Sequence, residues 1–162
     1  MQRPLDRVNH AYVAFGANMG DPARTFAEAL RELAPDVRVV AVSPAYRTRA
    51  IGPEQPDYLN LVAEVETALA PLDLLHRLQA LELAHGRARD LRWGPRTLDL
   101  DVIWYGGLEC YGPELILPHP RAHQREFVLR PLCDLAPGLE LHGRPAAEWL
   151  AGLEPQGVAR AD

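Results

Sequence analysis

Residues 58–69 read YLNLVAEVETAL and carry a clear strand pattern. Every odd-numbered position from Leu59 to Val65 is apolar, whereas most even-numbered positions carry polar or charged side chains. Successive side chains of a β-strand point to opposite faces, so this alternation predicts a half-buried strand. One face meets a core, and the other face carries Tyr58 and Asn60 side by side.

Upstream of this strand, the sequence predicts a helix between two further strands. Short apolar runs at 11–15 and 37–42 predict the strands. Asp21 followed by Pro22 is typical of a helix start, because Asp caps free N–H groups and proline fits the first turn. Apolar residues then recur at helical spacing up to Pro35, namely Phe26, Leu30 and Leu33. The runs 37–46 and 58–69 are expected to pair antiparallel across a loop rich in Gly and Pro.

Downstream, one more helix and one more strand complete the pattern. Leucines recur at helical spacing after Pro71, and Gly86 suits the left-handed residue that closes a helix. Residues 98–103 alternate and predict the strand. The resulting order βαββαβ predicts an α+β, ferredoxin-like fold, with the first two helices packed on one face of an antiparallel sheet. A C-terminal hairpin and helices follow, predicted at 106–107, 127–135 and 146–153.

Composition excludes several classes of protein. A length of 162 residues predicts a single domain over 1–162, and a net charge of −5 argues against a nucleic-acid partner. The sequence lacks an apolar run of about 18 residues, the length that a membrane helix needs, and an apolar signal core at its N-terminus. With two cysteines, we expect a cytoplasmic monomer. The absence of lysine excludes a Schiff base and a P-loop lysine, and a single serine, Ser43, argues against a serine hydrolase.

The chemistry concentrates in residues 92–103, RWGPRTLDLDVI. Asp99 and Asp101 share one face of the predicted strand, with Cβ atoms roughly 6–7 Å apart. Paired carboxylates suit hard cations such as Mg²⁺, and phosphoryl chemistry often uses two metals about 3.5–4 Å apart. The alternative is that the pair forms the solvated face of an edge strand.

Arginines gather directly before this strand, at Arg87, Arg89, Arg92 and Arg96. Guanidinium groups bind phosphate oxygens in a bidentate manner. Because Gly86, Gly94 and Pro95 interrupt the run, it indicates a shaped loop rather than a helix face. Carboxylates next to arginines therefore favour a site for a metal–polyphosphate complex, although arginine runs are also common on solvated surfaces.

Other candidate residues come from neighbouring elements. Tyr58 and Asn60 suit a flat heterocycle, since a ring stacks and an amide reads a donor and acceptor edge. Gln79 and Glu82 share a helix face, either towards a ligand or as an exposed polar stripe. His119 lies between two prolines, and the arginines that follow it are Arg121 and Arg125. Each of these residues also has a purely structural interpretation, as a core aromatic, a strand-surface amide or a solvated side chain.

These motifs together resemble the 6-hydroxymethyl-7,8-dihydropterin pyrophosphokinase family. The 92–103 string is similar to the signature of that family. Weaker matches occur in the same order along residues 11–137: Gly16-Ala17-Asn18, Tyr46-Arg47-Thr48, Gln55-Pro56-Asp57-Tyr58-Leu59-Asn60, Gln79-Ala80-Leu81-Glu82, Pro118-His119-Pro120-Arg121 and Arg125-Glu126-Phe127. The sequence departs from the family pattern at Ala17, Arg49 and Glu114.

The resemblance implies transfer of pyrophosphate from ATP to the pterin hydroxymethyl group, with release of AMP, in folate biosynthesis. It implies two Mg²⁺ ions on Asp99 and Asp101, with Arg87 and Arg96 as further catalytic residues. The implied ATP-binding residues are Gln79, Glu82, Arg87, Arg89, Arg92, Trp93, Arg96, His119 and Arg125. The implied pterin-binding residues are Thr48, Tyr58, Asn60, Trp93 and Phe127, with Trp93 and the arginine loop closing over the site.

Two other classes of function remain open on the sequence alone. An RNA-binding module of the same fold is disfavoured by the acidic charge and by the lack of suitably placed aromatic residues. A two-metal phosphohydrolase would use the same Asp pair, but it would release phosphate from ATP without a pterin.

Overall fold

The elements follow the predicted order in a computed structural model that describes residues 8–49, 55–86 and 97–161. The first half consists of β1 (Asn9–Ala17), α1 (Pro22–Glu32), β2 (Val37–Val42), β3 (Tyr46–Thr48), β4 (Tyr58–Thr67), α2 (Pro71–Ala84) and β5 (Asp99–Tyr105). The second half consists of β6 (Cys110–Tyr111), β7 (Ile116–Leu117), the 3₁₀ helix η2 (Ala122–Gln124), α3 (Glu126–Leu135), β8 (Glu140–Leu141), β9 (Arg144–Pro145), α4 (Ala146–Ala151) and β10 (Val158–Arg160).

The main sheet has the ferredoxin-like strand arrangement. Its central strands lie in the order β2-β4-β1-β5, and every neighbouring pair is antiparallel. Each crossover helix therefore joins two strands that have a third strand between them, as the predicted βαββαβ order requires. The predicted fold class is confirmed.

Local sequence signals explain where the elements begin and end. The Asp21 side chain accepts a hydrogen bond from the backbone N–H of Arg24 (3.3 Å) and caps α1. Gly86, with φ of 78°, follows α2 in the left-handed conformation that glycine adopts without a steric cost. Ser43 and Pro44 separate β2 from β3. The Ser43 hydroxyl accepts from the N–H of Val62 (2.9 Å), so β4 keeps its hydrogen bonding across the break.

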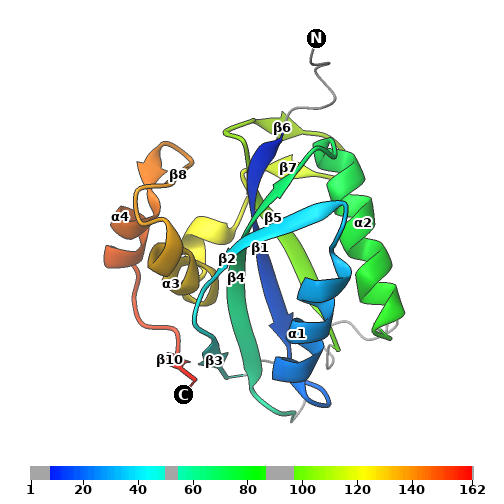
Figure 1. The fold of residues 1–162 in the computed structure, drawn as a ribbon. Helices are drawn as coiled ribbons and strands as arrows, with labels where there is room; N and C mark the ends of the chain where they lie inside the picture. The colour runs from blue at the N-terminus through cyan, green and yellow to red at the C-terminus, as the bar shows by residue number, and fades with distance from the viewer. Residues whose placement is uncertain (1–7, 50–54, 87–96, 162) are drawn as a thin grey trace.

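The helices cover both faces of the sheet, as Figure 1 shows. On one side, α1 and α2 cover a core that includes Phe15, Phe26 and Leu78. On the other side, α3 and α4 pack over a second cluster that includes Val62, Ile103 and Leu129. The prediction that the first two helices share one face is therefore confirmed, and the C-terminal elements cover the opposite one.

Strand β10 is, with the short β8–β9 pair, an element that the sequence did not predict. It pairs with β3 and extends the sheet to six strands within the described residues, in the order β10-β3-β4-β1-β5 with β2 also on β4. Three residues are too few to show an alternating pattern, so the strand depends on its partner for definition. In the described ranges, no helix combines the length and apolar character that crossing a membrane requires.

Candidate functional site

The candidate site is built on the face of the sheet that α3 covers. Gly16 on β1 pairs with Asn60 on β4 at one side and with Asp99 on β5 at the other. Side chains of directly paired residues lie on the same face of a sheet. The register therefore sets the Asn60 amide and the Asp99 carboxylate on either side of a residue that has no side chain.

Gly16, which has no side chain, lies between these two groups. A Cβ atom at this position would lie 3.2 Å from the Asn60 Oδ1 atom and 4.0 Å from the Asp99 Cβ atom. The first distance is tighter than ordinary van der Waals contact, so even a methyl group would press on the amide. Glycine at residue 16 therefore lets the Asn60 amide lie close against β1 on this face.

Asp99 and Asp101 project from β5 on the same face, as their spacing predicts. Their apolar neighbours Leu98, Leu100 and Val102 belong to the core beneath α1 and α2, so the two carboxylates point to the α3 side. Both are partly exposed and both make interactions within the protein. The pairing with β1 shifts register around Ile103, and this bulge ends the regular part of the strand just after the acidic pair.

Glu82 ties α2 to the backbone between the two aspartates. Its side chain is 3% exposed, and its Oε2 atom accepts a hydrogen bond from the N–H of Leu100 (2.8 Å). The interpretation of Glu82 as part of an exposed polar stripe is therefore wrong. Gln79, one turn earlier, is exposed, so the two residues do not share one environment. Glu82 supports the Asp pair from behind the strand.

His119 lies beside the same strand, just past the acidic pair. Its backbone N–H donates to the Ile103 carbonyl (2.9 Å), and its Nδ1 atom accepts from the N–H of Arg121 (3.1 Å). Burial, with nearby Arg125, Arg121, His142 and His123, lowers the pKa of His119 to about 4. The ring is therefore neutral near pH 7, and because Nδ1 accepts, Nε2 carries the proton and can donate to a ligand.

Tyr58, Asn60 and Thr48 lie together at one end of the sheet. Thr48 on β3 pairs directly with Tyr58 on β4, and the Asn60 Nδ2 group donates to the Thr48 hydroxyl (2.8 Å). Asn60 is 5% exposed, so it is not the solvated strand amide of the alternative interpretation. This bond holds the amide plane, with the Oδ1 atom directed towards Gly16.

Phe127 and Arg125 approach the same face from α3. Phe127 is partly buried against the cluster that contains Val62 and Leu129, and the Arg125 guanidinium carbon lies 5.6 Å from the centre of its ring. Arg125 is also among the charges that act on His119. These contacts link the loop beside β5 to the start of α3, so the structure brings the phosphate candidates and the aromatic candidate onto one side of the sheet.

Five predicted site residues lie outside the described residues: Arg87, Arg89, Arg92, Trp93 and Arg96. Their assignment to ATP or pterin binding stays a prediction.

A cavity of about 600 Å³ lies next to the first turn of α1, where β1 ends. It is lined by residues 18–23 together with Arg47, Pro56, Asp57 and Leu59. Leu59 packs against the core beneath α1 and α2, so this cavity opens on the other face of β4 and contains none of the predicted site residues. Its size alone therefore gives it no part in the site.

Sequence reasoning missed two contributors. It noted Gly16 only as part of a turn motif, because the place of this glycine between Asn60 and Asp99 depends on the register of three strands. It also gave no role to Glu126, which lies between Arg125 and Phe127 and is 5% exposed. A buried acid that interrupts an apolar helix is a detectable signal, because such a group needs partners.

Comparisons of the sequence converge on one family. The sequence profile of the 7,8-dihydro-6-hydroxymethylpterin-pyrophosphokinase (HPPK) family matches residues 12–137. A Pseudomonas aeruginosa protein named 2-amino-4-hydroxy-6-hydroxymethyldihydropteridine pyrophosphokinase is 48% identical over 157 residues, which is 94% of this chain and 97% of that protein. A protein of the same name from Methylorubrum extorquens is 41% identical over 158 residues, with 96% and 100% covered.

Solved structures agree on the fold. The crystal structure of Plasmodium falciparum HPPK-DHPS wild type with pteroate superposes with a TM-score of 0.71 at 14% identity. The match covers 90% of this chain but 42% of that longer chain. At this level of identity, the likeness concerns the fold alone.

Proposed function

This chain belongs to the 7,8-dihydro-6-hydroxymethylpterin-pyrophosphokinase family, and we propose that its reaction takes place on the α3 side of the sheet, around Asp99, Gly16 and Asn60. The reaction transfers the pyrophosphoryl group of ATP to the hydroxymethyl group of 6-hydroxymethyl-7,8-dihydropterin, giving AMP and the pterin diphosphate, in folate biosynthesis. The earlier alternatives, an RNA-binding module and a phosphohydrolase, are therefore set aside.

The observation that carries the proposed site is the lateral register Asn60–Gly16–Asp99. Neighbouring strands lie about 4.8 Å apart, so the amide and the carboxylate stem from backbones separated by roughly 10 Å. A pterin held at Asn60 would therefore direct its hydroxymethyl arm across Gly16 to a polyphosphate held at Asp99 and Asp101. Such positioning is what phosphoryl-type transfer needs most.

Asp99 and Asp101 are the proposed ligands of two Mg²⁺ ions. The donor set fits this ion, because both groups are oxygen ligands on one face and Gly16, the residue paired with Asp99, adds no side chain beside them. Over the described ranges, no three His, Cys, Asp or Glu side chains form a group suited to a metal. The remaining positions would fall to phosphate and water, as is usual for Mg²⁺ with nucleotides. Bound there, Mg²⁺ would neutralise phosphate charge and lower the pKa of the acceptor hydroxyl.

The phosphates of ATP are proposed to meet His119 and Arg125 within the described residues. His119 is neutral near pH 7 and offers its Nε2–H, while Arg125 supplies a permanent charge. Gln79 and Glu82 are the proposed contacts towards the nucleoside, and Glu82 also fixes the backbone of Leu100. Arg87, Arg89, Arg92, Trp93 and Arg96 complete the proposed ATP-binding set. Arg87 and Arg96 also keep their proposed catalytic role.

The pterin ring is proposed to lie between Tyr58 and Phe127. The amide oxygen of Asn60 points towards Gly16, and it can accept from the N–H groups of a pterin edge. Thr48 fixes that amide through its hydroxyl. Trp93 completes the proposed set. Aromatic stacking on both ring faces, with one amide reading the edge, would select a flat heterocycle.

We also propose that the chain acts as a cytoplasmic monomer with a single domain over 1–162, and that its partners are small molecules rather than nucleic acid or a membrane. The acidic net charge of −5 and the unpaired Cys110 and Cys133 support this proposal. Sedimentation of the purified protein at working concentration tests the monomer.

The proposed function is tested by following ATP conversion to AMP with Mg²⁺, with and without 6-hydroxymethyl-7,8-dihydropterin. AMP that forms only when both Mg²⁺ and the pterin are present supports the proposal. Release of ADP or phosphate from ATP without the pterin would indicate a phosphohydrolase instead. Undiminished AMP formation in excess EDTA would contradict the proposed role of Mg²⁺.

A further inference from the structure

The start of α3 carries two proposed site residues, and the side chain at its N-cap position does not cap the helix. Arg125 is the N-cap residue and its side chain makes no capping hydrogen bond. The first N–H groups of a helix have no partner inside the helix. The position of Arg125 and Phe127 therefore depends on what else binds the start of α3.

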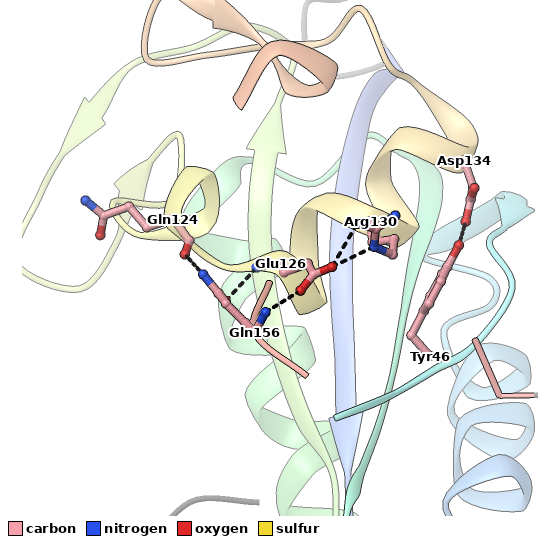
Figure 2. A network of polar contacts seen from close by, with 6 residues as sticks. All are labelled: Tyr46, Gln124, Glu126, Arg130, Asp134 and Gln156. Carbon is pink, nitrogen blue, oxygen red and sulfur yellow. Dashed lines mark hydrogen bonds and ion pairs between the residues drawn. The ribbon is translucent and has the colours of Figure 1, made fainter. Parts of the chain in front are cut away.

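Gln156, from the C-terminal segment, supplies that partner. Its Oε1 atom accepts from the N–H of Glu126 (2.9 Å), and its Nε2 group donates to the carbonyl of Gln124 (2.9 Å). Its backbone N–H donates to the Oε1 atom of Glu126 (2.7 Å). Figure 2 shows these three contacts: two reach Glu126, the residue between Arg125 and Phe127, and one reaches the backbone of Gln124.

The carboxylate of Glu126 is held from both sides. While Oε1 accepts from Gln156, Oε2 accepts from Arg130 one turn later, with N–O distances of 2.9 and 2.8 Å. Glu126 is 5% exposed, and a buried charge is tolerated when it is paired and hydrogen-bonded in this way. Gln156 itself is exposed, so the link to α3 begins at the surface and ends on a buried, fully paired carboxylate.

The same C-terminal segment also pairs with strand β3, on the side of the proposed pterin site opposite Phe127. After Gly157, whose φ of 76° turns the chain, Val158 pairs with Thr48 and Arg160 pairs with Tyr46. The Tyr46 hydroxyl in turn donates to Asp134 on α3 (Figure 2). Residues 156–160, which we name the C-terminal strap, thus join the start of α3 to strand β3.

We propose that Gln156 is a positioning residue for the pterin, because it sets the distance between Phe127 on α3 and the Thr48–Asn60 pair on the sheet. The inference rests on the proposed function, since it takes Phe127 and Asn60 as the groups that meet the pterin. Gln156 is not among the residues proposed to contact either substrate. It acts through the N-terminus of α3 on one side and, through β10, on β3 on the other.

The test compares pterin binding and turnover in the full chain carrying Gln156→Ala, with Gln124→Ala as the matched control. Gln124 has an exposed side chain, and the strap contacts only its backbone carbonyl. For Gln156→Ala we expect the pterin dissociation constant, by calorimetry, and its KM to rise about tenfold, roughly the effect of losing a helix cap. We expect kcat to change much less, and Gln124→Ala to match the wild type.

A double-mutant cycle separates positioning from a general loss of stability. The side chain of Gln156 bonds the start of α3, which carries Phe127, so adding Gln156→Ala to Phe127→Ala should leave the pterin dissociation constant unchanged. Should Gln156→Ala fail to fold, Gln156→Glu keeps an acceptor for the Glu126 N–H but sets a second carboxylate beside Glu126 and an acceptor against the Gln124 carbonyl; a rise of at least about tenfold is then expected. The wild-type dissociation constant in a folded variant with a lowered melting temperature would overturn the inference.

The outcomes also distinguish this inference from the proposed function. If Phe127→Ala weakens pterin binding and Gln156→Ala does not, the pterin site stands and the role of Gln156 fails. If Phe127→Ala itself leaves pterin binding unchanged, both the proposed aromatic wall and the inference built on it are overturned.

Discussion

Glu82 and Leu100 are joined by a hydrogen bond of 2.8 Å, from the backbone N–H of the residue that separates Asp99 from Asp101 to a carboxylate on α2. The bond comes from the opposite layer of the protein, and both groups are buried. The strand that carries the acidic pair is therefore fixed by a side chain that lies behind it.

Replacing Glu82 with alanine is expected to affect both stability and turnover. The buried N–H of Leu100 would lose its partner, which costs about 1–3 kcal/mol of unfolding free energy. The backbone at Asp99 and Asp101 would be held less tightly. A displacement of reacting groups by about 1 Å lowers kcat by up to about 10²-fold, and we expect a loss of up to this size. Urea unfolding and the AMP assay measure the two effects.

Glu82→Gln is the control for this change, because its side-chain oxygen can still accept the bond. It should retain most of the stability and most of the activity. If Glu82→Gln were as damaging as Glu82→Ala, the negative charge and not the bond to Leu100 would be the essential property.

Asp99→Asn and Asp101→Asn test the proposed Mg²⁺ ligands. Each substitution keeps the size of the side chain but removes the charge that a hard cation prefers. We expect turnover to fall by several orders of magnitude, with the thermal unfolding transition retained. Glu109→Gln, an exposed acid beyond the end of β5, is the matched control and should behave as the wild type. Near-normal turnover in either Asp variant would refute the assignment.

Gly16→Ala tests whether the residue between Asn60 and Asp99 must lack a side chain. The added methyl group would lie 3.2 Å from the Asn60 Oδ1 atom, in the path proposed for the hydroxymethyl arm. A rise of about tenfold in the pterin KM is expected, equivalent to 1.4 kcal/mol of binding. In Gly138→Ala the new methyl group meets no atom within 4 Å and should leave kinetics unchanged. A wild-type pterin KM for Gly16→Ala would place the pterin elsewhere.

The lowered pKa of His119 predicts a pH dependence of stability. Burial and the adjacent Arg125 hold the pKa at about 4 in the folded protein, against 6.5 for the free side chain. Between pH 6.5 and 4 the unfolded chain takes up a proton that the folded protein does not, so stability falls as the pH falls through this window. Above pH 6.5 this contribution is constant.

His119→Asn should remove part of that slope, because asparagine keeps an acceptor for the Arg121 N–H but does not titrate. The measurement is the urea unfolding free energy of both proteins from pH 4 to 8. His123, whose pKa burial also lowers, contributes a slope of the same sign that remains in the variant. Identical slopes for the two proteins would contradict a neutral, buried His119.

The order of strands and helices was predictable because each element carries its own local signal. The alternation in residues 58–69, the Asp21–Pro22 start and the glycine at residue 86 all act within a few residues. Strand β10 was not predictable in this way, since Val158, Ala159 and Arg160 form a strand only because β3 offers them an unpaired edge. Such an element is defined by its partner rather than by its own sequence.

The candidate site, like the fold, was predictable only where a local sequence pattern specifies the arrangement. Asp99 and Asp101 lie on one face because strand periodicity requires it, and the same argument joins Tyr58 to Asn60. The neighbourhood of Gly16 depends on the register of three strands, which no single segment specifies. The burial of Glu82 likewise could not be told from an exposed stripe, because helical spacing gives a residue's face but not the layer that covers it.

Two of the hydrogen bonds to β5 also affect whether the edge of this strand can pair with a second copy of the chain. Among the residues that the structure describes, β5 is the last strand on its side of the sheet, and an unpaired strand edge is a template for edge-to-edge aggregation. Along this edge the N–H of Leu100 is bound by Glu82 and the carbonyl of Ile103 by the N–H of His119. An incoming strand would find those groups already bonded. These contacts thus occupy part of the edge to which a strand of a second copy would add.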